Sequence, residues 1–334
     1  MTNRIENLKT ISVYSDWIKK ICTEKGILLD GESTPVKDDK LFRVPSNIGD
    51  LYLKKTTGFI NDELDFTLKL MDSGIIDLPE WVGYDRDMKI CLMRDMGGMD
   101  LSSLSSLDME TALNMFEYLA RMQRKSVEFV KTKDFNGFDY TTGAMLDELN
   151  YLPETAYEML SDTPYKIARD ETEKMKRNTE YVKSMLITVN DFYLPDTIHH
   201  GDLGTYNVRI AGGKCVFYDW GCGGRAHPFF DTVRLLNSMR DKLPADNNVR
   251  NTIIDAYLDK WSEYGSRDEL KNIFTLMNKL YGFYMLYYKY TRTRNLHRLY
   301  TTKFDSISAD GLGLDNRYST AATYIKRFIE SNFN

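Results

Sequence analysis

The stretch His199–Gly221, "HHGDLGTYNVRIAGGKCVFYDWG", decides the fold of this chain. Its short apolar runs predict a β hairpin over residues 199–219. Asp202, Asn207 and Asp219 stand at the ends of the predicted strands, although carboxylates and carboxamides are poor strand residues. Because a hairpin brings the ends of its strands together, we expect these three oxygen-bearing side chains to converge.

This set of side chains suits phosphoryl transfer. Carboxylate and carboxamide oxygens suit Mg²⁺, which proteins usually hold with one or two carboxylates plus substrate phosphates. The pattern predicts Asn207 and Asp219 as metal ligands and Asp202 as the base that orients and deprotonates a hydroxyl group. The alternative is that Asp202 and Asn207 only cap local backbone in turns, as such residues often do.

The composition limits the classes of function. The chain has 334 residues, of which 42% are hydrophobic and 28% charged, so it is large enough for two lobes. A net charge of -5 argues against binding nucleic acid through a broad basic surface. The four cysteines have no C-x-x-C spacing, and no apolar run approaches the roughly 20 residues of a membrane span. We therefore expect a cytoplasmic protein without a membrane or nucleic-acid partner; its oligomeric state stays open.

The order of elements predicts an α+β fold with two lobes, 1–96 and 97–334. The first lobe combines predicted strands with helices, and residues 97–106 form a polar connector. The second lobe is mostly helical apart from the hairpin at 199–221. Strands are predicted within 40–45, 50–56 and 81–96, and helices within 12–26, 61–74, 107–131, 141–160, 165–189, 229–242, 247–264, 267–294 and 316–331. The helix at 61–74 has Asn61 or Asp62 as its N-cap.

The motif H-G-D-x-x-x-x-N followed by D-W-G resembles the aminoglycoside phosphotransferase and choline kinase-like family. These enzymes are small-molecule relatives of protein kinases. The resemblance implies a bilobal protein-kinase-like fold, ATP or GTP with Mg²⁺ as cofactors, and transfer of the γ-phosphate to a hydroxyl group. "HPFFD" at 227–231 matches a family habit in which Asp231 braces the catalytic loop. A plain acidic residue at a helix N-terminus is the alternative for Asp231.

The resemblance also implies nucleotide-binding residues in the first lobe. A strand Lys that holds the phosphates matches Lys54, since the neighbouring Lys55 points to the opposite face of the strand. The helix Glu that holds this Lys matches Glu63, nine residues on, a shorter spacing than the family usually has.

Two further segments of the first lobe match by position. Ser46 and Asn47 lie where the phosphate-covering loop is expected and offer a hydroxyl, an amide and backbone N–H groups. The backbone of Arg94, Asp95 and Met96 lies where the family reads the adenine edge, at the hinge.

The acceptor is expected to be a small molecule, such as an aminoglycoside, an amino alcohol or a sugar. Only eleven residues separate Asp219 from Asp231, too few for the activation segment on which a protein kinase places its peptide. Acidic residues of the 107–190 region and the aromatic run 281–300 favour a cationic acceptor. Alternatively, they are a solvated helix face and core packing. The acidic residues are Asp147, Glu148 and Glu154.

A second class of function stays open. The chain could be a catalytically silent nucleotide-binding protein with a structural or regulatory role. The presence of a base, an Asn and a metal-binding Asp argues against this reading, because drift usually removes one of the three.

Overall fold

The computed structural model describes residues 2–37, 40–56, 62–302 and 313–331. The chain divides into two compact units. The first unit combines Met1–Ser105 with Leu203–Cys222, and the second combines Ser106–Asp202 with Gly223–Asn334. These units differ from the predicted lobes in where they place residues 97–105 and the hairpin. The lobes 1–96 and 97–334 stay a prediction, whereas the α+β class is confirmed.

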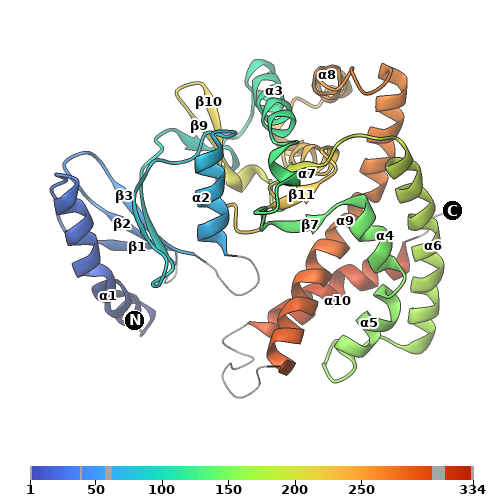
Figure 1. The fold of residues 1–334 in the computed structure, drawn as a ribbon, viewed down its shortest axis with the longest axis horizontal. Helices are drawn as coiled ribbons and strands as arrows, with labels where there is room; N and C mark the ends of the chain where they lie inside the picture. The colour runs from blue at the N-terminus through green and yellow to red at the C-terminus, as the bar shows by residue number, and fades with distance from the viewer. Residues whose placement is uncertain (1, 38–39, 57–61, 303–312, 332–334) are drawn as a thin grey trace. The chain divides into compact units, whose positions relative to one another are not determined.

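The first unit is built on an antiparallel sheet of five strands in the order β1-β2-β3-β5-β4. Helices α1 and α2 lie on opposite sides of strands β1–β3 in Figure 1. The elements are α1 (Thr2–Glu24), β1 (Thr34–Lys37), β2 (Leu41–Val44), β3 (Leu51–Lys55), α2 (Glu63–Ser73), β4 (Trp81–Asp85) and β5 (Ile90–Arg94). Strand β1 is the one that the sequence analysis did not predict.

The core of the first unit lies between α1 and the sheet. Ile18 and Cys22 of α1 pack against Phe42, Leu51 and Leu53 of the strands, all of them buried. Because side chains alternate along a strand, residues 51 and 53 of β3 face α1 and residue 54 faces the other side. The core therefore sets the face of the sheet on which position 54 lies.

Helix α2 has defined caps at both ends. The Asp62 side chain accepts hydrogen bonds from the N–H groups of Leu64 and Asp65, as expected of an N-cap. Gly74 ends the helix in the left-handed conformation with φ of 61°. The other candidate cap, Asn61, lies outside the described residues.

The polar connector after β5 contains a short strand and a 3-10 turn. Strand β6 (Met99–Asp100) pairs with β9 (Val208–Ala211), which pairs with β10 (Lys214–Phe217) in a three-stranded sheet. A 3-10 turn, η1 (Leu101–Ser103), follows and buries Leu101. Backbone pairing with the distant hairpin holds this polar segment, and local composition carries no sign of such a partner.

The second unit contains a small three-stranded sheet in the order β7-β11-β8. The central strand β11 (Gly224–Ala226) is parallel to β7 (Phe138–Tyr140) and antiparallel to β8 (Thr197–His199). The sequence analysis predicted neither β7 nor β11 as a strand. Strand β8 ends at His199, directly before the H-G-D-x-x-x-x-N motif, so this sheet positions the loop that leads to Asp202.

Helices make up most of the second unit, as predicted. Helix α3 packs against α8, α4 against α6, and α9 against α7 and α10. The helix predicted over 141–160 is two helices, because Pro153 starts a new one after a turn at Tyr151. The helices are α3 (Met109–Lys125), α4 (Thr142–Leu149), α5 (Leu152–Leu160), α6 (Arg169–Asp191), α7 (Phe229–Ser238), α8 (Asn247–Asp259), α9 (Arg267–Thr302) and α10 (Leu314–Glu330).

None of the helices in the described ranges is both long and apolar enough to cross a membrane.

We expect Gly98→Ala to destabilise the protein more than Gly97→Ala. Both glycines have left-handed backbone, with φ of 68° and 64°, so an added Cβ strains either position, by about 1 kcal/mol. A Cβ at Gly98 would also lie 1.9 Å from the Ile210 carbonyl oxygen in β9, whereas nothing lies within 4 Å of one at Gly97. Thermal unfolding of the two variants measures the difference; equal losses would mean that β6 does not need this close approach.

Candidate functional site

Lys54 of β3 is held between two carboxylates in the first unit. Its Nζ lies 2.5 Å from Glu63 Oε1 and 2.8 Å from Asp219 Oδ1. Burial alone would lower the pKa of this ammonium, but the charges of Glu63 and Asp219 and their hydrogen bonds raise it above its ordinary value. Lys54 is therefore a fixed positive charge at any physiological pH.

Glu63 begins α2 and reaches Lys54 despite a separation of only nine residues. Its side chain is 7% exposed, and it packs against Gly221 of the D-W-G motif. A Cβ at Gly221 would lie 3.1 Å from the Glu63 Cδ and Oε2 atoms, closer than ordinary packing allows. The absence of a side chain at position 221 thus leaves room for the Glu63 carboxylate.

The hairpin brings Asn207 and Asp219 together through the backbone. Asn207 ends a 3-10 turn, η3 (Thr205–Asn207), directly before β9, and Asp219 follows β10 by two residues. The Tyr218 N–H donates to the Asn207 carbonyl oxygen at 3.1 Å. The predicted hairpin is therefore present, and Asn207 and Asp219 lie at its open end.

Asp219 has an unusual backbone conformation. Its φ is 68°, and Lys89 is the other non-glycine residue with positive φ in the described part of the chain. Such conformations cost of order 1–3 kcal/mol and persist where the surrounding structure enforces them. With this backbone conformation, the half-exposed Asp219 carboxylate lies against Lys54.

The donors at this hairpin end fit a magnesium-type cation. Asn207 and Asp219 offer carboxamide and carboxylate oxygens, which hard divalent cations prefer. Within the described ranges, no three His, Cys, Asp or Glu side chains cluster so as to hold a metal ion. These two oxygen donors fit a cation that completes its coordination with water and phosphate, and they do not resemble an all-protein metal cage.

In the loop between β2 and β3, polar side chains form hydrogen bonds with backbone groups of the first unit. Ser46 Oγ donates to the Gly49 carbonyl oxygen at 2.5 Å. Asn47 Oδ1 accepts from the Leu28 N–H at 2.9 Å, and the Asn47 N–H donates to the Leu28 carbonyl oxygen. The structure thus gives Ser46 and Asn47 a role in shaping this loop, and contact with phosphate stays a prediction for both.

The segment predicted to read adenine follows β5. The Arg94 N–H donates to the Glu80 carbonyl oxygen at 2.8 Å, and the Asp95 N–H donates to the Asp50 carbonyl oxygen at 3.0 Å. These two donors are engaged within the protein. Among the three predicted residues, Met96 therefore becomes the candidate for a backbone N–H contact with a nucleotide base.

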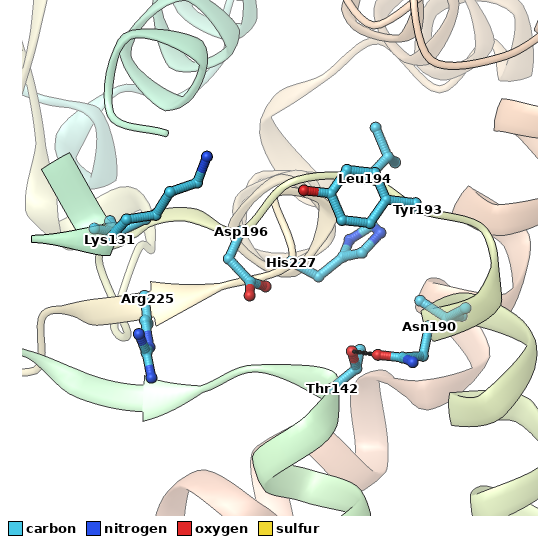
Figure 2. A pocket seen from close by; sticks show the side chains of 10 residues that line it. Lys131, Thr142, Asn190, Tyr193, Leu194, Asp196, Arg225 and His227 are labelled. Carbon is cyan, nitrogen blue, oxygen red and sulfur yellow. Dashed lines mark hydrogen bonds between the residues drawn. The ribbon is translucent and has the colours of Figure 1, made fainter. Parts of the chain in front are cut away.

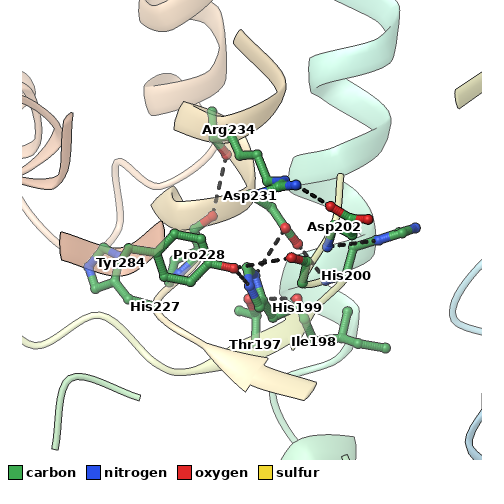
Figure 3. Close-up of polar contacts among 12 residues, drawn as sticks. Thr197, Ile198, His199, His200, Asp202, His227, Pro228, Asp231, Arg234 and Tyr284 are labelled. Carbon is green, nitrogen blue, oxygen red and sulfur yellow. Dashed lines mark hydrogen bonds and ion pairs between the residues drawn. The ribbon is translucent and has the colours of Figure 1, made fainter. Parts of the chain in front are cut away.

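Asp202 lies in the second unit, at the end of the loop after β8. Its carboxylate forms an ion pair with Arg234 of α7, whose side chain is only 7% exposed (Figure 3). The Arg234 guanidinium also lies near Met285 Sδ and over the Tyr288 ring, 5.8 Å from its centroid. Arg234 orients Asp202, and the sequence analysis did not identify it.

Asp231 braces the loop that leads to Asp202, as the resemblance implies. Its Oδ2 accepts from the His200 N–H at 2.7 Å, and its Oδ1 lies 3.0 Å from His199 Nδ1 (Figure 3). His199 Nε2 lies 2.5 Å from the Tyr284 hydroxyl. Burial would raise the pKa of Asp231, but the interactions with His199 and His200 hold it below its usual value.

His227 precedes this helix and is fully buried. Its Nδ1 accepts from the Phe229 N–H at 3.2 Å, and burial lowers its pKa to about 3. The ring is therefore neutral near pH 7, with its proton on Nε2.

A cavity of about 390 Å³ lies in the second unit between β7, α4 and α9. Asp139, Asp147, Glu148 and Arg294 supply its charged lining, and four aromatic residues line it too: Phe138, Tyr140, Tyr151 and Tyr287. Glu148 forms an ion pair with Arg294 and Asp139 one with Arg225, whereas Asp147 has no ion pair within the described residues.

The other acceptor candidates have structural roles. Glu154 forms exposed ion pairs with Arg169 and Lys176. Most of the aromatic run of α9 is core, since Tyr284, Tyr288 and Tyr290 are fully buried. Core packing is therefore confirmed for these tyrosines.

The predicted site residues fall into two groups. The first unit brings together Lys54, Glu63 and Asp219, with Asn207 beside Asp219 along the hairpin. The second unit carries Asp202, whose peptide bond to Leu203 joins the units. Asp202 and Asn207 are five residues apart, so their Cα atoms lie within about 18 Å at full extension.

The family model of the "Phosphotransferase enzyme family" matches residues 37–270, more than half of the chain. Among curated proteins, none matches the sequence. Two similar solved structures are a macrolide 2'-phosphotransferase from Brachybacterium faecium and the choline kinase LicA from Streptococcus pneumoniae. The first has 13% identity and a TM-score of 0.56, covering 96% of this chain and 99% of its own. The second has 14% identity and a TM-score of 0.54, covering 95% and 99%.

A third similar structure is the amicoumacin kinase hAmiN in complex with AMP-PNP, Ca²⁺ and Ami. It is 13% identical, has a TM-score of 0.54 and covers 93% of each chain. At such identities the three structures establish the fold, which is the protein-kinase-like α+β fold of this group.

The buried His227 predicts that folding stability falls as the pH falls. In the unfolded chain its imidazole binds a proton near pH 6.5, but the folded protein resists this until about pH 3. Protons therefore favour the unfolded state between these values, with a slope of up to about 1.4 kcal/mol per pH unit from this one group.

Urea denaturation of the wild type and of His227→Asn between pH 4 and 8 measures this effect. Asparagine keeps an acceptor for the Phe229 N–H but does not titrate. The wild type should lose stability relative to the variant on acidification. Parallel curves would contradict the assignment of a neutral buried imidazole.

Proposed function

Because the chain belongs to the phosphotransferase enzyme family, we propose that it transfers the γ-phosphate of ATP or GTP to a hydroxyl group of a small molecule. The observation that carries this proposal is Lys54, an ammonium held between Glu63 and Asp219. Phosphoryl transfer depends mainly on positioning and charge stabilisation, and a fixed cation beside a metal-binding carboxylate supplies both.

In the first unit, Lys54 binds the α- and β-phosphates and Glu63 holds its ammonium in place. Ser46 and Asn47 shape the loop that covers the phosphates, and the backbone near Met96 contacts the adenine edge. The hydrogen bonds of the loop support a preformed backbone there. A preformed loop loses less conformational entropy on binding than a disordered one.

Asn207 and Asp219 hold Mg²⁺ in this proposal. A divalent cation held by these two residues would neutralise charge that develops on the transferred phosphoryl group. Lys54 and Asp219 share a contact, so the ammonium and the cation-binding carboxylate are fixed relative to each other. The amicoumacin kinase structure, which contains a nucleotide analogue and Ca²⁺, supports nucleotide and divalent-cation use in proteins of this fold.

Asp202 is the base that accepts the proton of the acceptor hydroxyl. A hydroxyl nucleophile loses its proton as the phosphoryl group arrives, and we assign the role of accepting it to Asp202, five residues before the proposed metal ligand Asn207 along the chain. Its ion pair with the buried Arg234 and the bracing of residues 199–200 by Asp231 keep it in one orientation. Preorganisation of this kind is what a general base requires.

A positively charged acceptor is favoured by the 390 Å³ cavity of the second unit. Glu148 and Asp139 of its lining are paired with Arg294 and Arg225, whereas the third carboxylate, Asp147, has no ion pair within the described residues, and four aromatic rings complete the lining. Carboxylates and ring faces both attract amines and quaternary ammonium groups. Tyr140 of this lining lies 5.3 Å from the His199 ring, centroid to centroid, and His199 is three residues from Asp202.

Lys54→Ala should lower kcat/KM for ATP by about 10²–10³, the usual cost of removing one charge-stabilising donor. Lys55→Ala is the matched control, because neighbouring strand residues point to opposite faces, and it should stay close to wild type. Steady-state kinetics with thermal unfolding of each variant checks this. Equal losses in the two variants would move the phosphate contact away from Lys54.

Asp202→Asn should lower kcat by about 10²–10⁴ while nucleotide affinity stays near the wild-type value. The acceptor for this assay comes from a panel of amino sugars, amino alcohols and sugars mixed with ATP and Mg²⁺. Because Arg234 loses its charged partner, the variant should also unfold at a lower temperature.

Other outcomes for Asp202→Asn would change the proposal. Wild-type turnover would make Asp202 a turn residue, and loss of nucleotide binding would make it a metal ligand. Asp219→Asn is the comparison, since it should weaken nucleotide binding in the presence of Mg²⁺. If none of the acceptors in the panel led to consumption of ATP, the catalytically silent nucleotide-binding alternative would be favoured.

A further inference from the structure

Arg209 of β9 contacts the segment after β5 at three points. Its Nε donates to the Gly97 carbonyl oxygen at 2.7 Å. Its Nη2 lies 3.8 Å from Asp95 Oδ1 and its Nη1 lies 3.8 Å from Asp100 Oδ1, which is within the range of ion pairs but longer than a hydrogen bond. All four residues belong to the first unit. One planar guanidinium thus holds the chain at residues 95, 97 and 100.

The segment that Arg209 holds contains Met96, the candidate for a backbone contact with a nucleotide base. Asp95 Oδ1 accepts from the Gly97 N–H at 3.2 Å, which closes a turn around Met96. Gly97 and Gly98 are both left-handed, with φ of 64° and 68°. Because glycine has the widest choice of backbone conformations, two glycines in succession leave this turn poorly determined by its own residues. Contacts from outside the turn are needed to select one conformation, and Arg209 supplies them.

The sheet fixes the position of Arg209. It lies directly opposite Asp100 in the antiparallel pairing of β9 with β6. Its side chain is largely buried, which restricts its rotamers. The guanidinium is a rigid planar fork of donors, whereas a lysine ammonium is a single point charge on a flexible stem. Lysine at this position would therefore keep the charge and lose the arrangement of donors.

The charges around the turn also favour an arginine. Within the described ranges, Arg209 is the only cation that forms an ion pair with Asp95 or Asp100. Without it, two unneutralised carboxylates would flank the turn beside which the proposed polyanionic nucleotide binds. Like charges at short range disfavour binding.

Asp100 connects the same segment with the end of the hairpin. Its Oδ1 accepts from the Tyr218 hydroxyl at 3.0 Å, and Tyr218 directly precedes the proposed metal ligand Asp219. Burial and the charge of Asp100 raise the pKa of Tyr218, so its hydroxyl keeps the proton that it donates. Support of the metal-binding end of the hairpin is thus a competing role for Arg209.

We propose that Arg209 is a positioning residue for the nucleotide base, because it selects the conformation of the turn 95–97 in which the Met96 backbone meets the base. This inference rests on the proposed function, since it requires a nucleotide in the first unit. In this role Arg209 needs no contact with phosphate or metal. Its loss should weaken ligands that carry a base and spare ligands that consist of phosphates alone.

Isothermal titration calorimetry of the full chain tests this with two ligands, each in the presence of Mg²⁺. One is ATP or GTP, whichever the wild type binds more tightly, and the other is inorganic tripolyphosphate, which has phosphates but no base. Arg209→Ala and Arg209→Lys should each weaken nucleotide binding by about tenfold, the worth of one charge-assisted hydrogen bond. Both variants should bind tripolyphosphate as the wild type does.

Arg225→Ala is the matched control. Arg225 of β11 also lies opposite an aspartate of the neighbouring strand, Asp139, and pairs with it at 2.5 Å. It belongs to the second unit, where it lines a cavity of about 160 Å³ (Figure 2). Loss of this strand arginine should leave the affinity for both ligands unchanged, and thermal unfolding verifies that all three variants are folded.

Three outcomes would contradict the proposal. Equal losses for the nucleotide and tripolyphosphate would mean that Arg209 supports the metal-binding end of the hairpin. Wild-type nucleotide affinity in both Arg209 variants would overturn the inference and leave the proposed function standing. A wild-type protein that binds neither ATP nor GTP would overturn the proposed function and this inference with it.

Two further measurements keep the test decisive. If Arg209→Ala does not fold, Arg209→Lys carries the comparison. If tripolyphosphate binds the wild type too weakly to measure, nucleotide titrations with and without Mg²⁺ replace it. A loss of the same size in both conditions supports a role at the base, and a loss confined to the Mg²⁺ condition overturns it.

Discussion

The buried carboxylate of Asp231 is the constraint on which the conformation of the loop before Asp202 depends. A fully buried charge without partners costs several kcal/mol, so the protein must surround it with donors. It does so with the backbone of His200 and the ring of His199, and the first turn of α7 adds the favourable end of the helix dipole. The loop before Asp202 cannot move away without uncovering this charge.

Helix α7 holds the loop at a second point one turn later. Residues three apart on a helix share a face, so Asp231 and Arg234 address the same loop. The first binds its backbone and the second binds the Asp202 side chain. In the first unit the same logic applies to Lys54, whose face of β3 is set by the core residues Leu51 and Leu53 before it on the strand. Both halves of the proposed site thus take their geometry from packed elements, and loops carry only the last residues.

The sequence predicts what depends on local pattern and misses what depends on distant partners. The hairpin, the caps of α2 and most helices follow from apolar spacing and from residues such as Asp62 and Gly74. Strands β7 and β11 pair in parallel across 86 residues, and neither three-residue segment has a pattern of its own. Pairing with β9 likewise orders residues 99–100 although their composition indicates a loop.

Within the candidate site, the motif indicates Lys54 and Asp219, and the structure adds the contact that joins them. Glu63 is the instructive case: its spacing of nine residues from Lys54 is shorter than the family usually has, and its carboxylate nevertheless lies 2.5 Å from the Lys54 Nζ. Arg234 belongs to no motif that the sequence analysis used. An Arg three residues after a buried helix Asp is a usable signal only when the helix face is known. The tautomer of His227 depends on one backbone N–H and lies beyond any sequence pattern.

The division of the chain has a consequence for how the protein is made. The first unit takes its strands β9 and β10 from residues 203–222, although the rest of it ends at residue 105. During synthesis, the edge of β6 therefore waits for its partner while the ribosome adds residues 106–222, roughly 6–23 s at typical elongation rates. An unpaired edge of that kind invites wrong pairing in the nascent chain. A fragment that stops at residue 105 would leave this edge of β6 without its partner permanently, so residues 1–105 do not contain the whole first unit.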